Sequence, residues 1–281
     1  MIHVCFLRRR IFFNRLSFDN VTEEDKMKSV KFVVVVFSGI LIFAMEGFTR
    51  EIDKNTMAIW FFDETKGNVV KDISGRGHDL KVEGNNKWVK GKFGNALHFG
   101  DNTFIEHKSH PDFSFKNGMT IELWLNLEDI APQNVVGIPR NESEYVVAAY
   151  EQGKGFYMGP WIHNGAWVGP LNSPVVSPYG EWHHHAVTYD GKDLKVYVDG
   201  EHTGTRPIPG PMNQTDAPFR VSNSCCGGRF FVGAIDEMRL SNIPRTDAEI
   251  KEVASRGLAK ILSVDWLDKL TTSWADIKSQ Y

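Results

Sequence analysis

The sequence predicts an all-β fold in which two antiparallel layers stack on each other. Its 281 residues contain 25 glycines and 12 prolines, spread between short apolar runs, which indicates many turns and few long helices. Several of these runs alternate apolar and polar side chains, as strands with one buried face do. A single sandwich core of about 200 residues with flanking tails fits this length.

The charge balance argues against nucleic acid as a partner. The net charge is −3, and no block of lysine and arginine recurs within the expected domain. Binding to a phosphate backbone requires a clustered basic surface. We therefore expect no nucleic-acid partner.

The amino-terminal segment predicts export. Lys28 and Lys31 precede about a dozen mostly apolar residues at 32–43, the arrangement of a secretory signal peptide. This apolar stretch is shorter than the roughly 20 residues that span a bilayer, which disfavours a transmembrane helix. Because no small-x-small cleavage pattern follows, an uncleaved N-terminal anchor is the alternative and the one expected route to membrane contact. We assign residues 27–50 to this segment and expect a secreted or cell-envelope, extracytoplasmic protein.

Residues 1–26 form a doubtful leader. They precede Met27, and a signal peptide with such an extension is unusual. We expect Met27 to be the natural start, with a basic amphipathic helix around Arg8-Arg9-Arg10 as the alternative.

The first predicted strands flank turn-rich segments. Residues 57–62 form a β-rich run, and residues 72–79 form a long loop with glycine and aspartate. Residues 96–99 and 103–107 flank a polar bend at 100–102, which predicts a hairpin.

Residues 120–127 show the clearest alternation in the chain. One face of this strand carries only apolar side chains, namely Ile121, Leu123, Leu125 and Leu127. That face therefore lies against the core. Trp124 makes the opposite face partly apolar as well.

The next predicted strands are joined by tight turns. Residues 145–150 and 156–162 form two of them, around Gly153 and Gly155. Residues 182–189 and 194–198 form a hairpin around Asp190-Gly191, since glycine readily adopts the positive φ that such turns need.

A closing strand and a helix follow. Residues 230–240 form the strand, and Gly233 within it predicts a bulge or a close backbone approach. Thr246 and Glu249 have the spacing of a capping box, which predicts a short helix to about Ser255. Residues 256–281 form a C-terminal helical tail that contains Trp266 and Trp274.

Six separated motifs appear in a fixed order along the expected domain. They are Gly94-Asn-Ala-Leu-His-Phe99, Thr120-Ile-Glu-Leu-Trp124, Glu181-Trp-His-His184, Ala186-Val-Thr-Tyr-Asp-Gly191, Val196-Tyr-Val-Asp-Gly200 and Gly233-Ala-Ile-Asp-Glu237. Together they resemble the laminin-G-like (LamG-like) jellyroll domains, relatives of the pentraxins and of the concanavalin A-like lectins and glucanases. The resemblance covers residues 56–255. It departs from the family at His185, where a branched apolar residue is common.

The resemblance implies a two-sheet antiparallel jellyroll that acts outside the cytoplasm as a carbohydrate-binding or protein-binding module, often with calcium. In such folds the first loop lies near the last strand. Asp72 and Asp236, with carbonyls around Gly75 and His78, are therefore the expected calcium ligands. Two alternatives stay open. Asp101 and Asn102 form an acidic bend like that of the pentraxins, or Asp72 and Asp236 bond only to nearby backbone amides.

Three consecutive histidines suggest a metal site, but their alternation along a strand argues against one ion bound by all three. On a strand, His183 and His185 face one way and His184 the other, so the three cannot bind one ion. We expect His184 to be a core residue bonded to backbone. His183 and His185 offer two ligands, half of a tetrahedral zinc site.

Glycan binding requires exposed aromatic faces with polar groups beside them. Tyr157, Trp161 and Trp167 lie among Gly, Asn and His and are the candidate ligand-binding residues. The alternative is that these rings pack in the core, as most large aromatics of sandwiches do.

Cys225 and Cys226 are adjacent. We expect a disulfide bond between them, with two free thiols as the alternative.

The sequence lacks the motifs of the enzymes that share this fold. A Glu-x-Asp-x-x-Glu strand, a Gly-x-Ser-x-Gly elbow and a His-Glu-x-x-His helix are all absent. We therefore expect an exported binding module without catalytic residues that recognises carbohydrate or an extracellular protein. A glycoside hydrolase and a structural or adhesion protein of the cell envelope are the alternatives.

Overall fold

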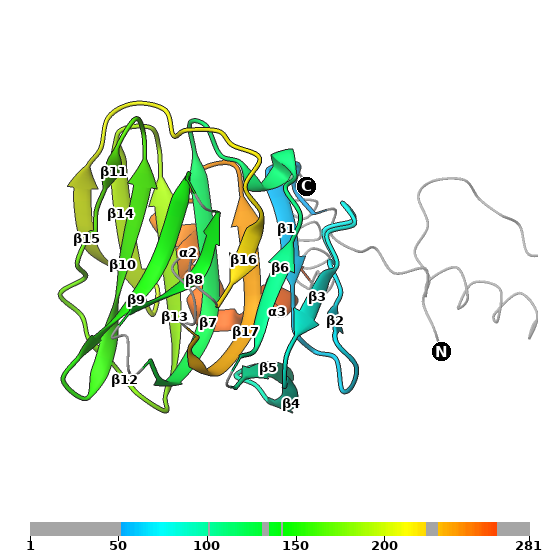
Figure 1. The fold of residues 1–281 in the computed structure, drawn as a ribbon. Helices are drawn as coiled ribbons and strands as arrows, with labels where there is room; N and C mark the ends of the chain where they lie inside the picture. Colours follow the sequence, from blue (N-terminus) through cyan, green and yellow to red (C-terminus); the bar gives the residue numbers. More distant parts are fainter. Residues whose placement is uncertain (1–51, 101, 131–134, 142, 223–229, 263–281) are drawn as a thin grey trace, which may run out of the picture. The chain divides into compact units, whose positions relative to one another are not determined.

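The computed structural model describes residues 52–100, 102–130, 135–141, 143–222 and 230–262. The expected signal segment, Asp101, Cys225, Cys226 and the tail beyond Leu262 lie outside the described residues. Strands dominate the described part and form two antiparallel sheets, as predicted (Figure 1). No helix in this part of the chain has the length and apolar character needed to cross a membrane.

The first sheet, which we call the helix-covered sheet, has the order β15-β14-β13-β7-β17-β5-β4, and β1 also pairs with β17. All of its pairings are antiparallel. Its strands are β1 (Thr56–Trp60), β4 (Lys87–Lys90), β5 (Asn95–Phe99), β7 (Met119–Asp129), β13 (Trp182–Tyr189), β14 (Asp193–Val198), β15 (Glu201–Pro207) and β17 (Val232–Ser241).

The second sheet, which we call the open sheet, has the order β11-β10-β9-β8-β16-β6-β3-β2, and β12 pairs with β10. Its strands are β2 (Val69–Val70), β3 (Leu80–Glu83), β6 (Phe104–His107), β8 (Val135–Asn141), β9 (Tyr145–Gln152), β10 (Gly155–His163), β11 (Trp167–Val168), β12 (Ser177–Pro178) and β16 (Phe219–Val221). A single 3₁₀ turn, η1 (Pro111–Phe113), follows β6.

The core lies between the two sheets. The four apolar residues predicted to face inward from β7 are all buried in it, and they pack with apolar residues of the open sheet such as Val147, Phe156 and Met158. The other face of β7 is buried too, at Thr120, Glu122 and Trp124.

Helices on the outer side of the helix-covered sheet form a second layer. They are α2 (Asp247–Arg256) and α3 (Leu258–Leu262). Ile250 of α2 packs against Ala186 and Tyr197, while Val253 and Leu258 pack against Ile59. The predicted capping box is present: the Thr246 hydroxyl accepts from Glu249 N, and the Glu249 carboxylate accepts from Thr246 N.

Glycines permit two close approaches of the backbone. A Cβ on Gly233 would lie 2.3 Å from Asn126 O, which confirms the predicted close approach of β17 to its neighbour. The turn after β14 ends in Gly200, with a φ of 82°. A Cβ there would lie 3.0 Å from the α2 residues Lys251 and Ala254, so that glycine lets the helix settle on the sheet.

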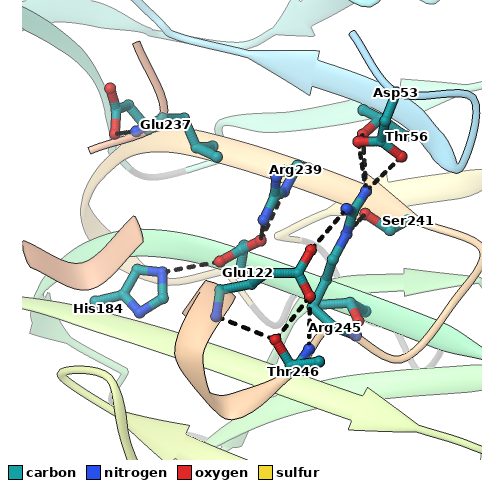
Figure 2. A network of polar contacts seen from close by, with 12 residues as sticks. Asp53, Thr56, Glu122, His184, Glu237, Arg239, Ser241, Arg245 and Thr246 are labelled. Carbon is teal, nitrogen blue, oxygen red and sulfur yellow. Dashed lines mark hydrogen bonds and ion pairs between the residues drawn. The ribbon is translucent and has the colours of Figure 1, made fainter. Parts of the chain in front are cut away.

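Arg245 ties α2 to the start of the described chain (Figure 2). Its guanidinium donates to Asp53 Oδ2 at 2.8 Å, Thr56 Oγ1 at 3.0 Å, Ser241 Oγ at 3.1 Å and Glu249 Oε1 at 3.1 Å. The side chain is buried and every donor group has an acceptor, so Arg245 cross-links the start of the described chain to the segment that joins β17 and α2.

An ion pair is buried between the helix-covered sheet and its helices. Glu122 of β7 lies directly opposite Arg239 of β17, and Arg239 Nε donates to Glu122 Oε1 at 2.7 Å (Figure 2). His184 Nε2 lies 3.4 Å from Glu122 Oε2. Burial raises the pKa of Glu122, but Arg239 and His184 outweigh burial, so its pKa lies below the ordinary value. His184 is therefore buried as predicted, beside a carboxylate instead of the expected backbone partner.

His185 points the other way, into the space between the sheets. It is buried, with its ring 5.3 Å from that of Phe156 and its Nε2 3.5 Å from Ser177 Oγ. Burial, together with neighbouring His184 and His183, lowers the pKa of His185 to about 3. The two-histidine site on this strand does not form a metal-ligating group, because His183 Nδ1 lies 2.8 Å from Asp199 Oδ2 and the two imidazoles are 6.4 Å apart between ring centroids.

The Glu122–Arg239 pair yields a test of how the outer layer is held. Arg239→Met leaves the Glu122 carboxylate buried without its main partner, and we expect the free energy of unfolding to fall by about 3–5 kcal/mol. The double variant Glu122→Leu/Arg239→Met removes both charges and should lose much less. Urea unfolding of Arg239→Met, Glu122→Leu and the double variant measures this, and a double variant whose loss equals the sum of the two single losses would contradict it.

His185 predicts a defined acid sensitivity. Between pH 6.5 and about 3 the unfolded chain holds a proton on this histidine and the folded chain does not, so stability falls as the pH falls through this window. The slope from this group is about 1.4 kcal/mol per pH unit. His185→Val should remove that slope in urea unfolding from pH 7 to 4, whereas His202→Val, at an exposed histidine, should keep it.

Candidate functional site

The outer face of the open sheet carries a row of aromatic side chains. Along β10, Phe156, Met158 and Ile162 are fully buried and face the core. Tyr157, Trp161 and His163 have the opposite parity and are half-buried. The alternation of a strand thus presents two large rings and an imidazole on the side away from the core.

Tyr150 of β9 completes this row. It lies directly opposite Tyr157, and the two rings stack with centroids 5.3 Å apart and planes 12° apart. Trp161 Nε1 donates to the Tyr150 hydroxyl at 2.6 Å. Three aromatic side chains are therefore fixed relative to one another before any ligand arrives, which lowers the conformational entropy lost on binding.

Trp167 extends the row toward the edge of the sheet. It lies on β11 opposite His163, and the two rings meet edge to face with centroids 5.1 Å apart. Trp167 is 44% exposed, and no other phenylalanine, tyrosine or tryptophan in the described part of the chain is as exposed. We call Tyr150, Tyr157, Trp161, His163 and Trp167 the aromatic patch.

Glycines beneath the rings let them lie flat on the sheet. A Cβ on Gly159 would lie 2.7 Å from the Tyr150 ring, and one on Gly169 would lie 2.6 Å from the Trp161 ring. Any larger residue at either position would lift a ring of the aromatic patch.

Polar groups border the patch. The side-chain amide of Asn213 is hydrogen-bonded to His163 Nδ1, which fixes the imidazole ring. Arg206 Nη1 donates to Pro170 O at 2.9 Å, and Asn164 Nδ2 donates to Pro209 O at 3.1 Å, so two segments beside the patch are held in place. Aromatic faces with adjacent hydrogen-bonding groups match the two sides of a sugar ring.

The three predicted ligand-binding residues therefore lie on one face, and sequence reasoning missed Tyr150 and His163. Tyr150 ends the predicted strand 145–150, and His163 directly follows the predicted strand 156–162. What was lacking was the register between β9 and β10, which sets Tyr150 opposite Tyr157.

The predicted metal ligand Asp72 bonds to its own loop and to β1. Asp72 Oδ1 accepts from Ile59 N at 3.1 Å and from Ser74 N at 2.9 Å. Asp72 Oδ2 accepts from Ser74 Oγ at 2.7 Å and from His78 N at 3.0 Å. These four bonds are those of a carboxylate that caps a turn, and they leave little capacity for a cation. Gly75 lies in the same turn with a φ of 83°.

The predicted ligand Asp236 bonds to a different loop, the one between β4 and β5. It is fully buried on β17, where Oδ2 accepts from Phe93 N at 2.8 Å and Oδ1 has no hydrogen-bond partner. Burial raises the pKa of Asp236 to about 8, and the charges of Glu237 and Asp63 act in the same direction. The charge of Asp63, in the loop after β1, thus acts on Asp236, whereas the predicted Asp72 is held by its own turn and by β1.

Glu237, Asn102 and His78 have separate surroundings. Glu237 accepts from Leu258 N at 2.7 Å and from Ala259 N at 3.0 Å, so it holds the start of α3. Asn102 is exposed in a turn with a φ of 61°. The imidazole of His78 is buried and contacts Asp112, 34 residues later.

Comparisons with solved structures find jellyroll domains. Domain 4 of AbnA, an extracellular arabinanase of Geobacillus stearothermophilus solved with arabinotriose, superposes with a TM-score of 0.57 at 20% identity, over 71% of this chain and 98% of that domain. The binding domain of botulinum neurotoxin DC in complex with SialylT gives 0.56 at 13% identity, over 73% of this chain and 51% of that one. Trypanosoma rangeli sialidase in complex with sialic acid gives 0.53 at 14% identity and 73% of this chain, but the match spans only 33% of that enzyme.

The sequence itself matches one family model. No curated protein sequence matches this chain at a significant level. Residues 99–251, more than half of the chain, match the laminin-G model described as the concanavalin A-like lectin/glucanases superfamily. These residues include β7, β9, β10, β13, β14 and β17, which supply most of both sheets. The chain therefore belongs to the concanavalin A-like lectin/glucanases superfamily.

Proposed function

We propose that this protein is a carbohydrate-binding module without catalytic activity, and that the aromatic patch is its sugar-binding surface. The observation that carries the proposal is the locked set of Tyr150, Tyr157 and Trp161, continued by the exposed Trp167. Aromatic faces stack on the apolar faces of sugar rings, while His163 and Asn213 offer hydrogen bonds to hydroxyl groups. Preorganised rings bind with a small entropy cost.

The comparisons favour this reading over that of an enzyme. The match to the arabinanase domain, solved with arabinotriose, covers 98% of that domain. The match to the sialidase covers only 33% of the sialidase chain. A hydrolase also needs two carboxylates that face one substrate. Glu122 is paired under the helices, and Glu237 bonds to α3, so neither is free for that role.

We also propose that the module acts outside the cytoplasm. The charged and apolar segment at 27–50 supports export, and sugar polymers are the ligands that an exported module meets. An adhesion role through protein contact is the competing function, and the same experiment separates the two.

The aromatic patch predicts which sugar contacts matter. On an array of defined plant, bacterial and animal glycans we expect binding to a restricted set, and Trp167→Ala should weaken it about tenfold or more because the exposed ring is lost. Trp182→Ala, at a half-buried tryptophan of the helix-covered sheet, is the matched control and should bind like the parent. If the folded parent protein binds no glycan on the array, the result would support protein adhesion instead.

Calcium is proposed at Asp236 with Asp63. The buried, unpartnered Asp236 Oδ1 fits a calcium ligand, and Asp63, whose charge acts on Asp236, is the candidate second carboxylate. Backbone carbonyls would complete the coordination, since calcium takes six to eight oxygens.

Melting with and without calcium tests this site. Saturating calcium should raise the melting temperature of the chelator-treated protein, because an ion that binds only the folded state stabilises it. Asp236→Asn keeps an oxygen for Phe93 N but cannot ionise when calcium binds, and should remove the calcium effect. An unchanged melting temperature of the parent protein at saturating calcium would count against the site.

A further inference from the structure

We propose that His78, His110 and Asp112 form a binding site for a divalent transition-metal ion of the zinc class. One ligand atom from each of these side chains lies within 4.8 Å of the ligand atoms of the other two. Among the residues that the structure describes, no other group of three metal-ligating side chains meets this spacing. The site differs from the calcium site in its residues, its loops and its chemistry.

The loop between β2 and β3 fixes His78. Its backbone N–H donates to Asp72 Oδ2 at 3.0 Å, and its carbonyl accepts from Trp60 Nε1 at 2.8 Å. The imidazole is buried, with its ring 4.7 Å from that of Phe113. Because both backbone groups and the ring are held, Nε2 is directed toward Asp112 at 2.8 Å.

The turn η1 supplies the other two ligands. His110 precedes it, and its Nδ1 accepts from Asp112 N at 3.1 Å, a bond that an ion bound at Nδ1 would replace. Asp112 Oδ2 lies 3.8 Å from His110 Nδ1 and 2.8 Å from His78 Nε2. Ligands about 2.0–2.1 Å from a tetrahedral zinc ion lie about 3.3 Å from each other, a spacing between these two distances. Small side-chain shifts would therefore suffice to admit an ion, and His110 has room for them because its side chain is 41% exposed.

The ligand types select the class of metal. Two imidazole nitrogens and one carboxylate suit zinc and its neighbours in the first transition row, whereas calcium and magnesium prefer oxygen alone. His107 packs edge-on against His78 at 5.6 Å, but its Nδ1 faces Lys108 O, so it stays outside the set.

Arg76 occupies the position of an outer-shell partner. Its Nη1 lies 3.3 Å from Asp112 Oδ2, while its Nε and Nη2 donate to Thr56 O and Lys54 O. A hydrogen bond of this kind commonly orients a ligating carboxylate. Its positive charge reduces the attraction for a cation, so we expect moderate affinity for the metal.

Solvent reaches the site at His110. His110 also lines a cavity of about 290 Å³, together with Ser109, Pro111, Ser114, Thr215 and Asp216. A water molecule from this cavity could complete a four-coordinate ion, as in zinc sites with three protein ligands.

Metal titration tests the proposal. The untagged full chain, freed of metal by a chelator, is titrated with zinc chloride in a calorimeter. We expect one zinc ion to bind at this site, and His110→Ala and Asp112→Asn each to weaken that binding at least about tenfold. Cobalt in place of zinc should give the visible absorption of a tetrahedral ion, and this signal should be lost in both variants.

Matched controls exclude other binding groups. His183→Ala removes an imidazole of the triple histidine, and Cys225→Ser/Cys226→Ser removes the adjacent thiols; both should bind zinc at this site like the parent. Melting of every variant without metal shows whether it folds, and His110→Ala keeps the test informative if Asp112→Asn is unstable, because His110 is partly exposed. Absence of zinc binding by the parent, or equal affinity in the parent and a folded His110→Ala, would overturn the proposal.

Discussion

The pairing of β7 with β17 is the contact on which the rest of the structure depends. These strands are more than 100 residues apart and lie side by side in the middle of the helix-covered sheet. An irregularity between Asp236 and Arg239 shifts the register, and Glu237 takes a φ of 43° there. Before it β17 pairs with β5, and after it with β1. One bulge thus lets a single strand organise two neighbours on the same edge.

The same bulge decides which side chains face the helices. Ile235 and Met238 both point into the core although they are three positions apart, so Asp236 and Arg239 both lie on the outer face. Arg239 thereby meets Glu122, and the free Asp236 oxygen is left in a buried place. Charged groups are rarely buried without partners, so the outer layer of α2 and α3 is specified by polar contacts as well as by its small apolar clusters.

The two sheets have separate tasks as a result. The outer face of the helix-covered sheet is covered by α2 and α3 and carries the ion pairs of Glu122 and Arg245. The open sheet keeps its outer face for the aromatic patch, where large rings rest on Gly159 and Gly169. A rigid scaffold beneath a set of fixed rings is the arrangement that binding surfaces favour, since little order has to be created when a ligand arrives.

The sequence by itself determined the all-β class, the apolar face at 121–127, the Asp190-Gly191 hairpin, the close approach at Gly233 and the Thr246 capping box, because each depends on neighbours along the chain. Only the tertiary structure decided partners across long separations. It set Tyr150 beside Tyr157, Asp236 under the loop that holds Phe93 instead of beside Asp72, and the His78 imidazole beside Asp112. Strand register and loop packing are fixed by the whole core, and a one-residue change in the register of β9 against β10 would turn Tyr150 and Tyr157 to opposite faces of the sheet.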